Sequence, residues 1–294
     1  MMSKINRLVI LIVSILAVAL IVPSATWSHS TVRMLEARHN SKMSPVIWVP
    51  GSSANQDRYD PVFKQLNSGK DKHSVLKITV NTNNKVEYTG SIRPNDRQPF
   101  IVIAFQDNKD GYPTIKKQAK WFNTAFNELT KRYHFNNFSA VGHSNGGLVL
   151  SFFLEDYNNA AETRMTKLVT MGSPYNSYEN SLSNKTVMLN DLIDGRSKID
   201  KDLSVYSISG SETYSSDGIV PLQSVEAGKY VFQNQVKHYT QLTFTGSDTE
   251  HSDLPSNPQV LDIIRKNILN DKDRNMQQNS GQNVQHKNTP ITNK

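Results

Sequence analysis

The sequence between residues 138 and 157 constrains the fold more than any other segment. An apolar run, Phe138–Val141, is followed at once by Gly142–Gly146 (GHSNG), and apolar residues then recur at helical spacing as far as Tyr157. Such a string presents a serine, here Ser144, on a sharp turn between a strand and a helix, where flanking glycines avoid steric clashes. A glycine-rich turn without chemistry is the alternative interpretation. The strand before the turn and the helix after it favour a nucleophilic serine.

Short apolar runs alternate with helical patterns along the rest of the body. Seven runs have the length and β-branched content of strands: Val46–Val49, Val75–Val80, Phe100–Phe105, Phe138–Val141, Leu168–Met171, Leu203–Ile208 and Leu242–Phe244. Helices are expected over Pro113–Tyr133, from Gly146, and from about residues 256–258. Val80–Ile92 contains an Asn-rich turn sequence between two β-prone stretches and predicts a hairpin. This alternation predicts an α/β fold whose mainly parallel central sheet is covered by helices on both faces.

The two ends of the chain differ in composition from the body. Lys4 and Arg7 precede a largely apolar run, so residues 1–28 are predicted to be a signal peptide or an N-terminal anchor. Either one places the protein outside the cytoplasm, secreted or at the cell surface, with membrane or cell-envelope association through the N-terminus. Residues 272–294 are rich in Asn, Gln, Lys and Ser and predict a disordered polar tail. One domain, residues 29–271, lies between the two ends.

The chain contains no cysteine, which excludes disulfides, thiolate metal sites and a cysteine nucleophile. An exported protein without disulfides fits the surface of a Gram-positive bacterium. The net charge of +7 suits an anionic envelope, although a charge that serves only solubility explains it equally well. Because no Lys/Arg cluster is interleaved with aromatic residues, no nucleic-acid partner is expected. No metal and no organic cofactor is implied.

A serine nucleophile needs a base, and His251 is the best placed of the eight histidines. Most of the others precede Ser144 or lie in the tail, and His143, beside Ser144, is expected to point away from it. His251 follows the last predicted strand and precedes the last predicted helix, whereas His238 precedes that strand, at its opposite end. A plain surface histidine is the alternative interpretation of His251.

The base needs an acid, and Asp217 is the candidate because it follows the predicted strand Leu203–Ile208. Asp248 and Asp253 share the loop of His251 and lie too close to it in sequence, and Asp202 precedes the strand. A turn aspartate beside a glycine is the alternative interpretation of Asp217.

Two backbone N–H groups are needed to stabilise an oxyanion. Asn145, which follows the serine, supplies one, and Ser52, in the loop after Val46–Val49, is the candidate for the other. The sequence around Ser52 also reads as a simple turn. Residues 175–201 are polar with a short apolar centre, and they predict a small cap over the site.

Six strings in order carry a family resemblance: VIWVPGSS, PFIVIAFQDN, AVGHSNGG, LVTMGSPYN, SSDGIVPLQSV and EHSDLPSNPQV. Together they span about Val46 to Leu269 and resemble an α/β-hydrolase family of Gram-positive bacteria, whose members are labelled cell-surface hydrolase or hydrolase of unknown function. The resemblance implies the α/β-hydrolase fold and a triad at Ser144, Asp217 and His251. The chain departs from the family in two places: Pro50-Gly51 stands where His-Gly is usual, and Asn145 stands where many members have Met.

The sequence therefore predicts a serine hydrolase that cleaves carboxylic esters through an acyl-enzyme, with a small-molecule ester as its partner. The small polar cap predicts a preference for short acyl chains. An acyltransferase or an amidase would use the same triad, and a non-catalytic surface binding module could share the same fold.

Overall fold

The computed structural model describes residues 15, 19, 32, 36 and 38–269. The predicted tail, 272–294, lies outside the described residues, as does the predicted signal segment 1–28 apart from residues 15 and 19. Within the described residues, none of the helices combines the length and the apolar character that crossing a membrane requires.

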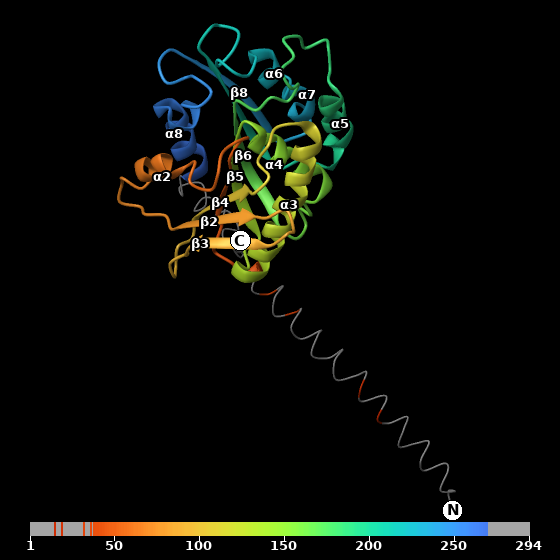
Figure 1. Ribbon diagram of the computed structural model, residues 1–294. Helices are drawn as coiled ribbons and strands as arrows, with labels where there is room; N and C mark the ends of the chain where they lie inside the picture. The colour runs from red at the N-terminus through yellow and green to blue at the C-terminus, as the bar shows by residue number, and fades with distance from the viewer. Residues whose placement is uncertain (1–14, 16–18, 20–31, 33–35, 37, 270–294) are drawn as a thin grey trace, which may run out of the picture.

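The described residues form strands and helices that alternate along the chain (Figure 1). The strands are β1 (Val46–Val49), β2 (Val75–Val80), β3 (Val86–Gly90), β4 (Phe100–Phe105), β5 (Asn137–His143), β6 (Arg164–Met171), β7 (Ser204–Ser211) and β8 (His238–Thr245). The α-helices are α2 (Asp60–Leu66), α3 (Tyr112–Tyr133), α4 (Asn145–Asp156), α5 (Val187–Gly195), α6 (Leu222–Glu226), α7 (Lys229–Phe232) and α8 (Pro258–Ile264). Short turns of other helix types are η1 (Arg196–Lys198), η2 (Leu254–Ser256) and η3 (Arg265–Leu269).

The strands form one eight-stranded sheet in the order β3-β2-β4-β1-β5-β6-β7-β8. Every neighbouring pair is parallel except β2 and β3, which form the predicted hairpin with Val80 opposite Val86. The α/β fold with a mainly parallel sheet is confirmed. Because parallel strands end at the same edge, the loops after β1, β4, β5, β6, β7 and β8 all meet at one edge of the sheet.

The predicted strand bounds hold for β1, β2 and β4, whereas β5 to β8 are longer than their apolar runs. β8 gives one correction: His238 is the first residue of that strand and does not precede it. Its pairing with Ser204 of β7 extends the ladder over polar residues that an apolar run does not mark.

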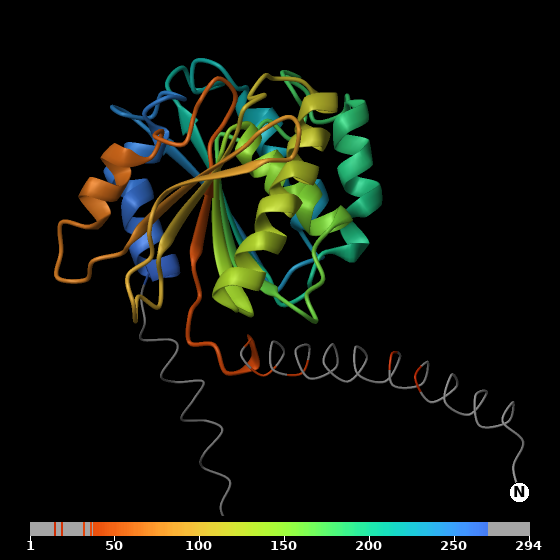
Figure 2. The same cartoon turned by 60° about the horizontal axis from the view of Figure 1, so that its bottom comes forward.

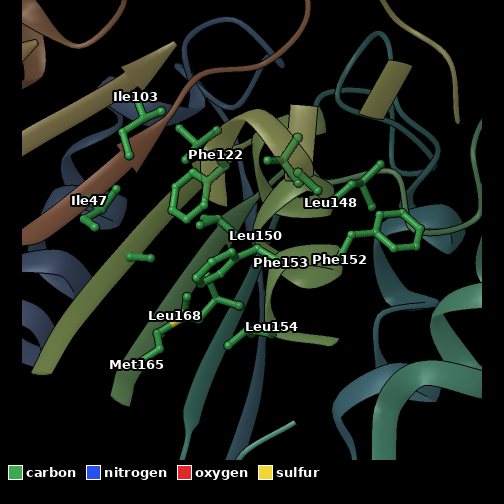
Figure 3. Close-up of a cluster of buried hydrophobic side chains, with 14 of the residues drawn as sticks. Ile47, Ile103, Phe122, Leu148, Leu150, Phe152, Phe153, Leu154, Met165 and Leu168 are labelled. Carbon is green, nitrogen blue, oxygen red and sulfur yellow. The ribbon is translucent and has the colours of Figure 1, made fainter. Parts of the chain in front are cut away.

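Helices cover both faces of the sheet (Figure 2). The side chains of the strands alternate between two buried clusters, one on each face. In β1, Ile47 and Val49 belong to the cluster under α3, α4 and α5, while Val46 and Trp48 belong to the cluster under α2 and α8. Figure 3 shows part of the first cluster, in which residues of α4 such as Phe153 lie with strand residues such as Ile47. Burial on both faces explains why the inner strands read as continuous apolar runs.

Residues 175–201, predicted as a cap, form a loop followed by α5 and η1. The apolar residues Met188, Leu189 and Leu192 of α5 are buried in the first cluster, whereas Val187 is 74% exposed. The apolar face of this helix is therefore used to pack on the body of the domain.

Glu155, in the last turn of α4, is a buried carboxyl group beneath the end of α5. A Cβ atom at Gly195 would lie 2.4 Å from its Oε2 atom, so the glycine makes room for this carboxyl. Burial raises the pKa of Glu155 to about 9; the charges of Asp156 and Asp191 also raise it, while two nearby lysines lower it. Glu155 therefore carries its proton at neutral pH.

Glu155→Gln is expected to stabilise the protein at alkaline pH. The unfolded chain ionises this carboxyl above its ordinary pKa of 4.5, while the folded protein keeps it protonated up to about pH 9. The native state therefore loses stability as the pH rises between these two values. Because glutamine cannot ionise, the variant should gain ~5 kcal/mol in free energy of unfolding near pH 8, and little near pH 4.

Chemical denaturation of both proteins across this pH range measures the difference, with the exposed Glu250→Gln as the control. A stability difference that does not change with pH would mean that Glu155 is not protonated in the native state.

Candidate active site

Ser144 stands on a strained turn between β5 and α4. Its backbone has φ 54° and ψ −128°, a conformation that side-chain-bearing residues rarely adopt and that costs about 1–3 kcal/mol. A Cβ atom at Gly142 would lie 2.5 Å from the nitrogen of Gly147, and one at Gly146 would lie 2.1 Å from the Val49 carbonyl oxygen. Only glycine fits at these two positions, which explains the spacing of the motif.

The loop after β1 lies directly against Ser144. A Cβ atom at Gly51 would lie 2.7 Å from the Cβ atom of Ser144. In this loop the Ser53 N–H donates to the Asn108 carbonyl at 2.8 Å, while the Ser52 N–H donates to no group within the described residues. The Asn145 N–H, at the start of α4, is likewise free within that part of the chain. Two unused donors thus flank the serine, as an oxyanion site requires.

Asp217 and His251 come together at the same edge of the sheet. The Nδ1–H of His251 donates to Asp217 Oδ2 at 2.7 Å, and both side chains are buried. Asp217 Oδ1 accepts the backbone N–H groups of Ile219 at 3.1 Å and Val220 at 2.7 Å. The carboxylate is therefore fixed by three donors and holds the His251 ring in one tautomer.

The backbone of His251 is held on both sides. Its N–H donates to the Asp217 carbonyl at 2.8 Å, and its own carbonyl accepts the Nε2–H of His143 at 2.8 Å. Burial, with the charges of His251 and Arg58, holds the pKa of His143 well below its usual value, so His143 is neutral. The His143 side chain therefore lies against the loop that carries His251. The bond also places the two histidine rings 4.7 Å apart, which brings His251 close to the neighbour of Ser144.

Gly172, at the end of β6, makes room for the Asp217–His251 pair. It adopts φ +56°, and a Cβ atom there would lie 3.0 Å from both Asp217 Oδ2 and His251 Nδ1. Within the described residues, His251 Nε2 and Ser144 Oγ form no hydrogen bond. Because Nδ1 is bonded to Asp217, Nε2 is the ring nitrogen left to act on the serine. The hydrogen bond between a base and its nucleophile is commonly long or poorly aligned before substrate binds.

Within the described residues, none of the rival candidates bonds to the side chain of Asp217 or His251. His238 is exposed at the amino end of β8. Asp202 pairs with Arg164 at 3.2 Å at the far end of the sheet, and the side chains of Asp248 and Asp253 are exposed.

The structure adds three residues that the sequence did not single out for these roles: Asp110, His143 and Gly172. Asp110 accepts a hydrogen bond from the Asn145 side chain at 2.7 Å. His143 directly precedes the predicted nucleophile, and Gly172 directly follows the predicted strand Leu168–Met171; these positions were their only sequence signals, and Asp110 offered none beyond an Asp-Gly turn.

The family described as alpha/beta hydrolase of unknown function (DUF915) matches residues 35–271. The chain belongs to this family. Its resemblance to Gram-positive cell-surface hydrolases is thereby confirmed, and the α/β-hydrolase fold with it. No curated protein matches the chain.

The solved structures that are similar to this hydrolase-family chain include the following two. A candidate cell surface hydrolase from Lactobacillus plantarum WCFS1 is 49% identical, with a TM-score of 0.72; the match covers 82% of this chain and 98% of that one. A gene product of Listeria innocua is 29% identical, with a TM-score of 0.69, and the match covers 76% of this chain and 92% of that one.

Proposed function

We propose that this α/β hydrolase is a serine esterase that cleaves carboxylic esters through an acyl-enzyme. The observation that carries the proposal is the Asp217–His251 pair, bonded at 2.7 Å and held next to the strained turn of Ser144. A hydrolase built in this way needs no group beyond its own side chains and backbone.

The proposed reaction has two halves. As Ser144 Oγ attacks the ester carbonyl, His251 Nε2 takes the hydroxyl proton of Ser144. His251 then delivers that proton to the leaving alcohol. A water molecule then attacks the acyl-enzyme by the reverse route, with His251 as base again. The free N–H groups of Ser52 and Asn145 stabilise the oxyanion in both halves, a contribution of about 10²–10³-fold per donor.

A fluorophosphonate probe and a panel of esters test this function. We expect stoichiometric labelling that maps to Ser144 and is lost in His251→Ala. Absence of both labelling and turnover would support the binding-module alternative. Faster transfer of the acyl group to an added alcohol or amine than to water would identify an acyltransferase, and faster cleavage of anilides than of esters an amidase.

We expect the enzyme to prefer short acyl chains, of roughly two to six carbons. The apolar face of α5 is used in the core, so it adds little apolar surface over the serine. Each buried CH₂ contributes ~0.8 kcal/mol only where apolar surface is available to bury it. The measurement is kcat/KM for acetyl, butyryl, octanoyl and palmitoyl esters of one chromogenic alcohol.

A maximum at octanoyl or beyond would contradict the predicted short-chain preference. A jump in rate above the solubility limit of the substrate would indicate activation at a lipid interface. In that case Tyr214 (92% exposed) and Ile219 (54% exposed), in the loop that carries Asp217, would be the residues to contact the interface.

We also propose that the protein acts outside the cytoplasm, at the cell surface or secreted, with residues 1–28 as its signal or anchor. The support is the basic, then apolar, N-terminal sequence and the similarity to the candidate cell surface hydrolase of Lactobacillus plantarum.

A further inference from the structure

Asp110, in the loop between β4 and α3, joins three elements around the serine. Its Oδ1 atom accepts the side-chain N–H of Asn145 at 2.7 Å and the backbone N–H of Gly111 at 2.7 Å. Its Oδ2 atom accepts the hydroxyl of Tyr178 at 2.7 Å. We call Asp110, Asn145 and Tyr178 the Asp110 bridge.

The strand order places this bridge next to Ser144. Asp110 follows β4, Tyr178 follows β6, and β1 and β5 lie between these two strands. Ser144 directly follows β5, and Asn145 is the first residue of α4. The bridge therefore spans the carboxyl ends of β1 and β5 on the face covered by α3, α4 and α5. His251 leads into α8, which covers the opposite face.

The chemistry of the proposed reaction requires different parts of the substrate to lie on the His251 side and on the bridge side of Ser144. The leaving alcohol has to lie near His251 Nε2, which gives it a proton. The carbonyl oxygen has to point toward the Ser52 and Asn145 N–H groups. The acyl chain is then left on the side away from His251, toward the bridge.

The bridge persists at neutral pH. Burial raises the pKa of Asp110, but hydrogen bonds from Asn145, Tyr178 and the Gly111 N–H outweigh burial and hold the pKa below its ordinary value. The hydrogen bond to Asp110, with burial, raises the pKa of Tyr178 to about 12. A carboxylate thus faces a protonated hydroxyl, and the hydrogen bond between them is charge-assisted. Tyr178 is 57% exposed, so this bond, rather than packing, holds its side chain in place.

We propose that the Asp110 bridge limits the length of the acyl chain accepted at Ser144, with Tyr178 as the barrier and Asp110 as the residue that positions it. This proposal rests on the proposed esterase function and explains how that enzyme would select short chains. In this arrangement the Asn145 side chain is hydrogen-bonded to Asp110, so only the backbone N–H of Asn145 is available to stabilise the oxyanion.

Tyr178→Phe tests the proposal by removing one oxygen from an exposed residue. We expect the ratio of kcat/KM for the octanoyl ester to that for the acetyl ester to rise about tenfold, as for loss of one charge-assisted hydrogen bond. The kcat for the acetyl ester should stay within about threefold of wild type, because the triad and both oxyanion donors are intact. Tyr214→Phe, the same change at an exposed tyrosine that is not part of the bridge, is the matched control.

Asp110→Ala should raise the same ratio, and Asp110→Ala combined with Tyr178→Phe should raise it no further, because both changes open one bridge. Additive effects, an unchanged ratio in Tyr178→Phe, or an equal rise in Tyr214→Phe would each overturn the proposal. Ester turnover with an unchanged ratio would refute the bridge alone. A wild-type protein that neither turns over esters nor binds the fluorophosphonate would refute the esterase function, and the bridge as an acyl-chain barrier with it.

Discussion

Ser144→Ala is expected to lower kcat for ester hydrolysis by about 10⁶-fold, the loss typical of a triad serine. No other serine in the described part of the chain combines a strained strand-to-helix turn with two free backbone N–H groups beside it. Without the Ser144 hydroxyl no acyl-enzyme can form, so only the weak catalysis of the oxyanion site would remain. The measurement is single-turnover and steady-state hydrolysis of the best short-chain ester, together with fluorophosphonate labelling.

The fold should tolerate this change, because it removes one oxygen and keeps the backbone conformation of residue 144. Ser53→Ala is the matched control: it makes the same change in the neighbouring loop, at another residue of positive φ, and should keep full activity. If Ser144→Ala kept a tenth of wild-type turnover, Ser144 could not be the nucleophile.

The sequence predicted the centre of the sheet well because the inner strands are buried on both faces. β1 and β4 are buried at every position and appear as apolar runs with the bounds of the structure, whereas β2, also predicted with the right bounds, alternates between buried and half-buried residues. The apolar residues that become buried lie within each strand, so a local stretch of sequence is enough to reveal them.

Short helices were harder to predict. α2, α6 and α7 went unpredicted because each spans too few residues for a helical period to emerge from the sequence. The start of β8 at His238 depends on pairing with β7, which no local pattern records.

The candidate site likewise contains residues that the sequence could predict and one that it could not. Ser144, Asp217 and His251 were selected from chain order and strand ends, because parallel strands bring the loops that follow them to one edge. Asp110 could not be selected in this manner. Its partners Asn145 and Tyr178 are far away in sequence, and its local string, Asp-Gly, is common in turns.

Asp217→Asn is expected to lower kcat by about 10⁴-fold, because it reverses the tautomer of His251. Asp217 Oδ1 accepts the N–H groups of Ile219 and Val220, so the amide oxygen of an asparagine would occupy this position. The amide nitrogen would then face His251 Nδ1, which would have to accept a hydrogen bond instead of donating one. The proton would move to Nε2, and the ring could no longer take a proton from Ser144.

Asp248→Asn is the matched control for this prediction. Asp248 lies in the loop of His251, but its side chain is exposed and, within the described residues, bonds to no part of the triad. The control should therefore keep kcat within about threefold of wild type, since surface changes of this kind have small effects. The same ester assay measures both variants, and the rate of phosphonate labelling should fall in parallel with kcat only for Asp217→Asn. A larger loss in Asp248→Asn than in Asp217→Asn would assign the acid to the His251 loop. The 2.7 Å hydrogen bond between Asp217 and His251 would then be structural rather than catalytic.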